Sequence, residues 1–194
     1  MRPPAWLLAA MTALWLVVAP VAAAERSLDK QVELPATLDQ VWDAWTTRDG
    51  ITSFFAPDAQ IEPTVGGAFH IYIDPLAASG SKGADEMRYM ALQPKKMLSF
   101  DWNAPPSLPE ARAQRTFVIL RFEPTAQQRT RLSLHHVGWG DGGEWDKAYA
   151  YFDKAWDHVL GNLQTRFETG RPQDWTAWLE QLRKWHDQPP PAKP

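Results

Sequence analysis

The feature that most constrains the fold is a run of short β-type segments between residues 66 and 138, with no helical stretch between them. Apolar and polar residues alternate within the segments, which is the period of a strand with one buried face. Parallel neighbours need a crossover of a dozen or more residues, so these short connections predict an antiparallel sheet. Together with one earlier segment, the predicted strands are 28–34, 68–73, 86–92, 97–102, 116–122 and 130–137.

The same alternation assigns a face to each side chain of these predicted strands. Trp102 falls on the apolar face of its segment, and His136 falls on the apolar face of the last one. The adjacent His135 then points to the opposite face, so the His135-His136 pair does not predict a metal site. By the same rule Arg88 shares the inward face of its segment, where it needs a partner, a ligand or a path to water.

A long amphipathic helix is predicted at 143–167, directly after the last strand. Gly170 and Pro172 follow it as a normal helix stop. An antiparallel sheet with one apolar face needs a cover, and this helix is the longest element available. The prediction is therefore an α+β fold of the helix-grip type, in which a curved antiparallel sheet wraps around a long C-terminal helix. The apolar stripe of the helix comprises Trp145, Tyr149, Phe152, Trp156, Val159 and Leu163.

Two further helical regions flank these elements. Thr37 and Gln40 have the spacing of a capping box, which predicts a helix that ends at Gly50 and is followed by a helical turn at 51–55. An extra helix is predicted from Pro172 to about residue 186. Its stripe is too apolar to face water, and we expect it to dock on its own domain rather than on a partner or a membrane surface. The stripe comprises Trp175, Trp178, Leu179, Leu182 and Trp185.

The first 24 residues have the pattern of a secretory signal peptide. Arg2 precedes an apolar run, and small residues at 22–24 offer a cleavage site before Glu25. We expect a cut after Ala24 and a periplasmic or secreted mature protein, the alternative being an uncleaved N-terminal anchor. The predicted organisation is a signal peptide at 1–24, one domain at 25–170, the amphipathic helix at 171–187 and a disordered Pro-rich tail at 188–194.

Composition narrows the function classes. The formal net charge is −3 and becomes −4 without Arg2, which argues against nucleic acid because such a partner needs a basic patch. The chain has no Cys, no Gly-x-Ser-x-Gly elbow and no Gly-rich phosphate loop. Neither a metal nor a cofactor is predicted, and no stable membrane insertion is expected once the signal peptide is removed.

Several local strings, in this order, resemble the START-like (SRPBCC) superfamily and its branch related to the activator of the heat-shock-protein-90 ATPase. The resemblance covers roughly residues 28–168 and implies the helix-grip fold already predicted from the strand and helix pattern. The matching strings are 32–36, 41–45, 54–57, 66–69, 94–102, 132–139, Trp145 and 151–156.

The resemblance implies a cavity where the sheet and the long helix diverge. Members of the superfamily hold ligands there, so we expect a small apolar or aromatic ligand, bound by a monomer or a homodimer. The residues expected to face this cavity are Phe54, Phe55, Arg88, Trp102, His136, Trp139, Trp145, Tyr149 and Phe152. The alternative is that these rings have a packing role only and fill the hydrophobic core.

His136 is the single candidate for chemistry. A histidine can exchange protons near neutral pH, so an acid/base enzyme of the cyclase, dehydratase or hydrolase type is the alternative function. A buried neutral histidine that is satisfied by hydrogen bonds is the structural alternative. A chaperone-like interaction protein is a third possibility, which rests on the family resemblance alone.

Overall fold

The computed structural model describes residues 25–188. The predicted signal peptide at 1–24 lies outside the described residues, as does the predicted tail from residue 189 onward. Among the described residues, no helix is both long enough and apolar enough to cross a membrane.

A five-stranded antiparallel sheet forms one layer, in the order β1-β8-β7-β6-β5. Short connections join β5 to β6 and β7 to β8, and β1 pairs with β8 at one edge of the sheet. The connection between β6 and β7, residues 103–115, contains the short helix α3 (Pro109–Arg112), so the expectation that no helical stretch lies between residues 66 and 138 is wrong. The strands are β1 (Leu28–Leu34), β5 (Tyr89–Gln93), β6 (Met97–Trp102), β7 (Thr116–Pro124) and β8 (Thr130–Val137). The two short connections explain the antiparallel pairing of β5 with β6 and of β7 with β8.

A smaller three-stranded sheet, in the order β2-β3-β4, continues this layer. The backbone N–H of Phe69 donates to Met87 O at 2.8 Å, and that of Tyr89 donates to Gly67 O at 3.0 Å, which joins the two sheets. The strands are β2 (Asp58–Ile61), β3 (Phe69–Tyr72) and β4 (Gly83–Ala84). Only β3 was predicted; β4, with two residues, is too short to display a period, and β2 was missed although it is as long as β3.

The pairing of β5 with β6 contains a bulge that reverses a predicted face. Tyr89 pairs with Phe100 and Leu92 pairs with Leu98, with a register shift between them. The bulge inserts one residue and turns the strand. As a result Tyr89 is buried and Arg88 is exposed on the outer face. The prediction that Arg88 points inward is wrong for this reason.

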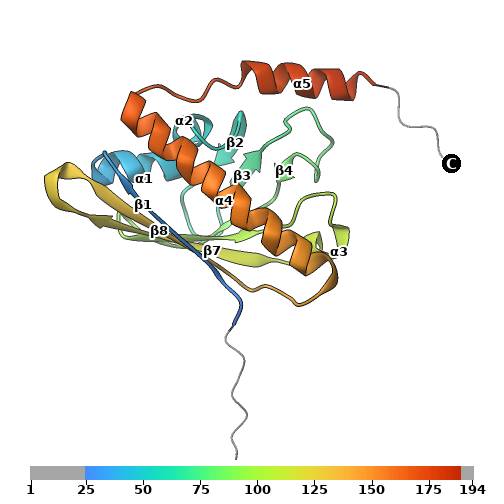
Figure 1. Ribbon diagram of the computed structural model, residues 1–194, viewed down its shortest axis with the longest axis horizontal. Helices are drawn as coiled ribbons and strands as arrows, with labels where there is room; N and C mark the ends of the chain where they lie inside the picture. The colour runs from blue at the N-terminus through green and yellow to red at the C-terminus, as the bar shows by residue number, and fades with distance from the viewer. Residues whose placement is uncertain (1–24, 189–194) are drawn as a thin grey trace, which may run out of the picture.

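Short helical elements lie at both ends of the sheet (Figure 1). The predicted capping box is confirmed, because Thr37 accepts from Gln40 N and the Gln40 side chain accepts from Thr37 N. The predicted first helix is divided in two at Thr47, which ends one helix and caps the next. The short helical elements are α1 (Leu38–Thr46), α2 (Arg48–Thr52), α3 (Pro109–Arg112) and η1 (Ala126–Gln128).

The long helix α4 (Gly143–Thr169) lies across one face of the sheet and confirms the helix-grip arrangement (Figure 1). Phe152, Trp156 and Leu163 of this helix pack against the inward-facing side chains of the sheet and form one core with them. Gly170 ends the helix in a left-handed conformation, φ 68°, which a residue with a side chain rarely adopts. The chain can therefore turn sharply at this point.

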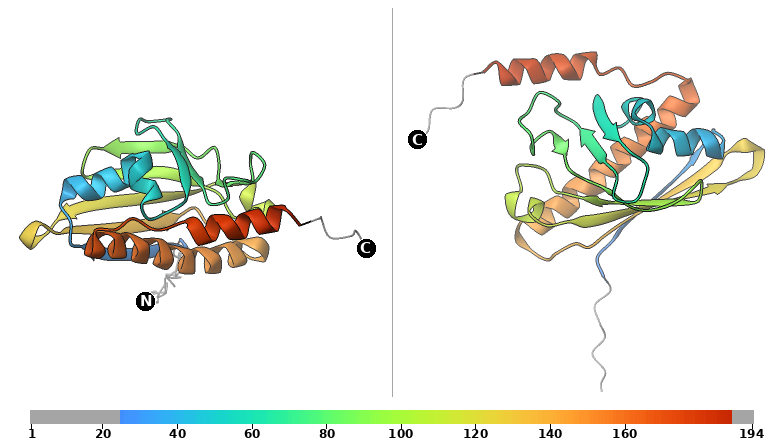
Figure 2. Two further views of the ribbon diagram at one scale, coloured as in Figure 1. Left: turned by 90° about the horizontal axis from the view of Figure 1, so that it is seen from above. Right: turned by 180° about the vertical axis from the view of Figure 1, so that it is seen from behind.

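The C-terminal helix α5 (Thr176–His186) follows an extended stretch and folds back beside the domain (Figures 1 and 2). It begins four residues later than the predicted start at Pro172. Leu182 is only 1% exposed and Trp175, Trp178 and Leu179 are half-buried, whereas Trp185 at the end of the stripe is 50% exposed, so the domain covers the stripe in part. This confirms the prediction that the helix docks on its own chain.

Candidate functional site

A cavity of about 510 Å³ lies between α4 and the C-terminal segment 173–181, which forms its roof. Trp102, at the end of β6, and Phe55, just after α2, supply the inner wall. The α4 wall consists of Tyr151, Phe152, Ala155, Trp156 and Val159, together with His158 at the edge. Trp102 is the one lining residue that comes from the five-stranded sheet, so the cavity lies between α4 and the C-terminal segment rather than along the sheet.

A second cavity of about 290 Å³ adjoins the first on the side of β4 and the segment after β6. Five residues line both cavities, so the two spaces are separated only by shared side chains. These residues are Ile73, Trp102, Tyr151, Phe152 and Trp178.

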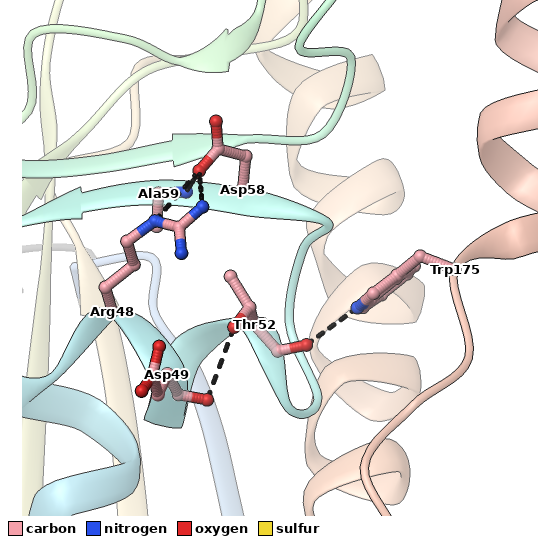
Figure 3. A network of polar contacts seen from close by, with 6 residues as sticks. All are labelled: Arg48, Asp49, Thr52, Asp58, Ala59 and Trp175. Carbon is pink, nitrogen blue, oxygen red and sulfur yellow. Dashed lines mark hydrogen bonds and ion pairs between the residues drawn. The ribbon is translucent and has the colours of Figure 1, made fainter.

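The roof is attached to the turn after α2 by two hydrogen bonds. Trp175 Nε1 donates to Thr52 O at 2.7 Å, and the backbone N–H of Gln173 donates to Ser53 O at 2.8 Å. Figure 3 shows the first of these bonds together with the neighbouring ion pair of Arg48 and Asp58, which ties α2 to β2 at 2.8 Å. The anchor point is therefore itself fixed to the smaller sheet.

Helix α5 is attached a second time, at the end of β3. Trp178 Nε1 donates to Ile73 O at 2.7 Å, and His186 Nε2 lies 2.8 Å from Asp74 Oδ2. The ring of Trp185 packs edge-on against Trp178, with centroids 5.6 Å apart. Because both cavities have Trp178 in their walls, the residues that hold the roof in place also shape the site.

The inner wall is a cluster of aromatic rings around Trp102. Its ring centroid lies 6.0 Å from that of Phe55, 5.6 Å from that of Trp156 and 6.5 Å from that of Phe152. Edge-on and tilted contacts of this kind add to the stabilisation from buried area. The cluster is apolar, so it is suited to contact with a flat apolar molecule.

His136 lies behind this wall and lines neither cavity. Its Nδ1 accepts from Trp156 Nε1 at 2.9 Å, which leaves the proton on Nε2, and Nε2 donates to Thr116 Oγ1 at 2.7 Å. The Thr116 hydroxyl in turn donates to Trp102 O at 3.2 Å. Each polar group in this series of hydrogen bonds has a partner. His136 therefore orients Trp156 and holds the end of β6 in place.

Burial lowers the pKa of His136 to about 3, with a smaller contribution from the neighbouring His135. The side chain is 0% exposed, and its charged form would lose its hydration without gaining a counter-ion. A general acid/base works best with a pKa near the working pH. The arrangement therefore matches the alternative of a buried, satisfied histidine and does not favour proton transfer.

The structure brings together three of the nine predicted ligand-binding residues, namely Phe55, Trp102 and Phe152. Phe54 is fully buried in the core against Trp45 and does not form a lid. Arg88 is on the outer face, where its Nη1 donates to Gly66 O at 2.9 Å. The prediction that these two residues face the cavity is wrong.

The predicted residues Trp139, Trp145 and Tyr149 lie around the junction of β8 and α4, outside both cavities. Trp139 and Trp145 pack against α3 and Ala148. The Tyr149 hydroxyl donates to Ser27 O at 2.8 Å, beside the start of β1. Their placement in the cavity is also wrong, because a helix of this length covers several separate regions and its stripe does not reveal which turn faces the open space.

Sequence reasoning left the residues of the roof out of the predicted site and placed Trp156 in the stripe that covers the sheet rather than among the ligand-binding residues. Tyr151 lies off the apolar stripe of α4, so period analysis had no reason to select it. Trp175 and Trp178 were recognised as part of a docking stripe, but the position where that stripe docks depends on the turn at Gly170.

The profile of the family described as "Activator of Hsp90 ATPase homolog 1-like protein" matches residues 35–168, which is more than half of the chain. The chain belongs to this family. The match ends before the roof segment, so Trp175 and Trp178 lie outside the part that matches the family. A comparison with curated proteins finds no match.

Solved structures similar to this chain support the assignment of the fold. Protein MLL2253 from Mesorhizobium loti is 22% identical, covers 84% of this chain and 100% of its own, and has a TM-score of 0.56. The Aha1 dimer from Colwellia psychrerythraea is 18% identical over 75% of this chain and 98% of its own, with a TM-score of 0.57. CalU16 from Micromonospora echinospora is 20% identical over 84% and 87%, with a TM-score of 0.56.

Proposed function

We propose that the protein binds a small apolar or aromatic molecule in the 510 Å³ cavity beneath the C-terminal segment. The observation that carries this proposal is an aromatic cavity with few polar groups, closed on one side by a roof that is hydrogen-bonded in place. Ligand sites usually have a volume of about 300–1,000 Å³ and predominantly apolar walls. Membership of a family with the helix-grip fold supports the same function.

A cavity-filling substitution tests this proposal. Ala155→Phe places a ring in the cavity, so we expect the Kd of a neutral fluorescent probe, N-phenyl-1-naphthylamine, to rise roughly tenfold or more. Ala150→Phe is the matched control, because Ala150 is exposed on the same helix and lines neither cavity. Fluorescence titration and native mass spectrometry measure both. Equal affinities for wild type and Ala155→Phe would refute binding at this site.

We also propose that the protein acts outside the cytoplasm as a monomer or homodimer. The apolar run that follows Arg2 and the small residues before Glu25 support export. We expect the intact mass of protein from a periplasmic or secreted fraction to correspond to a chain that begins at Glu25. A mass that includes residues 1–24 would support the uncleaved anchor instead.

A further inference from the structure

The second cavity has walls of its own besides the five side chains that it shares with the first. One wall is the stretch 81–84, which includes β4, and the other is the segment 103–106, which follows β6. Neither stretch lines the first cavity. The second cavity therefore extends the space beneath the roof and ends at these two walls.

The character of the lining changes along the two cavities. The five shared residues carry no formal charge, and four of them are aromatic. The Asp, Lys and His residues of the lining each belong to one cavity only, His158 and Asp174 to the first, and Asp74 and Lys82 to the second. The ammonium group of Lys82 lies over the ring of Tyr72, 5.1 Å from its centroid, and Tyr72 lines neither cavity. The passage between the cavities is therefore apolar.

Arg112, in α3, joins the two walls of the second cavity. Its Nη1 donates to Ala104 O at 2.5 Å, in the wall after β6. Its Nη2 donates to Gly80 O at 2.7 Å and to Gly83 O at 2.8 Å, on the loop that forms the other wall. The planar guanidinium has several donors in a fixed arrangement, so it can hold carbonyl groups from two segments at once. Arg112 itself lines neither cavity.

A buried carboxylate holds the same loop from within. Asp85 is 6% exposed, and its Oδ2 accepts from the backbone N–H groups of Gly80 at 2.7 Å and Lys82 at 3.2 Å. An irregular loop has no ladder to pair its backbone groups, so side chains must provide partners. Asp85 closes the turn, and Arg112 fastens the closed turn to the opposite wall. The position of the far end of the cavity thus depends on Arg112.

We propose that the ligand is an elongated, apolar molecule that spans both cavities, and that Arg112 is the positioning residue that sets where the site ends. This inference rests on the proposed function, because it specifies the shape of a ligand in the same site. A molecule longer than the first cavity passes Trp102, Phe152 and Trp178 and reaches the walls that Arg112 joins. Its affinity depends on Arg112 through the wall, without direct contact.

Two rigid, neutral probes that differ in length test the span. The probes trans-stilbene and all-trans-diphenylhexatriene each carry two phenyl rings, and the second has two more C=C units between them. Neither molecule can fold back into the first cavity. We expect wild type to bind diphenylhexatriene roughly tenfold or more tightly than trans-stilbene, because the longer probe buries more apolar surface.

Ser81→Trp places a ring in the second cavity alone, because Ser81 is an exposed residue of its wall and does not line the first. It should raise the Kd of diphenylhexatriene roughly tenfold or more and change that of trans-stilbene by less than about twofold. Ser79→Trp is the matched control. Ser79 is exposed on the same loop and lines neither cavity, so both Kd values should stay at the wild-type level.

Arg112→Met removes the guanidinium that joins the walls. It should raise the Kd of diphenylhexatriene roughly fivefold or more and that of trans-stilbene by less than about twofold. Arg115→Met is the control, because Arg115 pairs with Asp101 at 3.5 Å and lines neither cavity. A purely structural role would weaken both probes alike, so the ratio of the two Kd values separates positioning from folding, and calorimetry reports the stability of each variant.

The outcomes separate this inference from the proposed function. If wild type binds both probes and neither Ser81→Trp nor Arg112→Met changes the ratio, the span is refuted while the binding function stands. Binding of trans-stilbene without binding of diphenylhexatriene refutes the span as well. If Ser81→Trp changes the ratio and Arg112→Met does not, the role assigned to Arg112 is overturned. If wild type binds neither probe, the proposed function fails for this class of ligand and the inference fails with it.

Discussion

Truncation after Gly170 should lower the melting temperature by roughly 5–15 °C and remove ligand binding. The deleted segment contains Leu182, which is 1% exposed, and removal of one such side chain costs about 2–5 kcal/mol. The cavity also loses its roof, so Trp102 and Phe152 become accessible to water. Differential scanning calorimetry and probe titration measure the two effects, and increased binding of a hydrophobic dye should accompany them.

Two results would distinguish docking from other roles of the segment. A chain that ends at Gln188 is the control, and we expect it to keep both the stability and the affinity of the full chain. An unchanged melting temperature after truncation at Gly170, together with the loss of a dimer in light scattering, would instead assign the apolar stripe to a partner subunit.

Acidification should destabilise the protein through His136, with a slope of about 1.4 kcal/mol per pH unit for this one group. Its pKa in the folded state is lowered to about 3 from an ordinary value of 6.5, so between these values the unfolded chain binds one proton more. The contribution of His136 to the free energy of unfolding is therefore at its maximum above pH 6.5 and is lost as the pH falls toward 3. Urea unfolding between about pH 4.5 and 6.5 measures the slope.

The variant His136→Gln isolates this contribution. A glutamine amide can accept from Trp156 and donate to Thr116, but it does not titrate. The slope of stability against pH should therefore decrease by about 1.4 kcal/mol per pH unit, the contribution of one proton. Some loss of stability at pH 7 is expected from imperfect geometry. The carboxylate of Asp29, whose pKa is lowered by its hydrogen bond with His135, titrates below the chosen window and does not affect the comparison. The same slope in both proteins would show that His136 is not the group responsible.

Local sequence signals were sufficient for much of the fold. The capping box at Thr37 predicts a helix start because it depends on residues three positions apart. The alternation that placed Trp102 and His136 inward also depends only on neighbouring residues, and both are buried. Arg88 fails the same test because the bulge between Tyr89 and Ala91 interrupts the alternation, and nothing in the local sequence marks it.

The candidate site was less predictable, since it depends on long-range placement. Trp139, Trp145 and Tyr149 have the same spacing and chemistry as Phe152 and Trp156, yet only the last two line the cavity. Trp139 precedes α4, and Trp145 and Tyr149 lie on its first two turns, whereas Phe152 and Trp156 lie level with Trp102 at the end of β6. That level is set by how the whole helix packs on the sheet.

The sequence by itself determined the order of elements, the antiparallel sheet, the long covering helix and the apolar stripe that docks at the C-terminus. These depend on periodicity and on short connections, which are local properties. Only the tertiary structure decided that the stripe forms the roof of a cavity, that His136 is occupied in holding Trp156, and that Arg112 joins the two walls of the second cavity. The reason is physical. Each of these facts concerns groups brought together from positions 50 to 180, and the free energy of packing them is not encoded in any one segment.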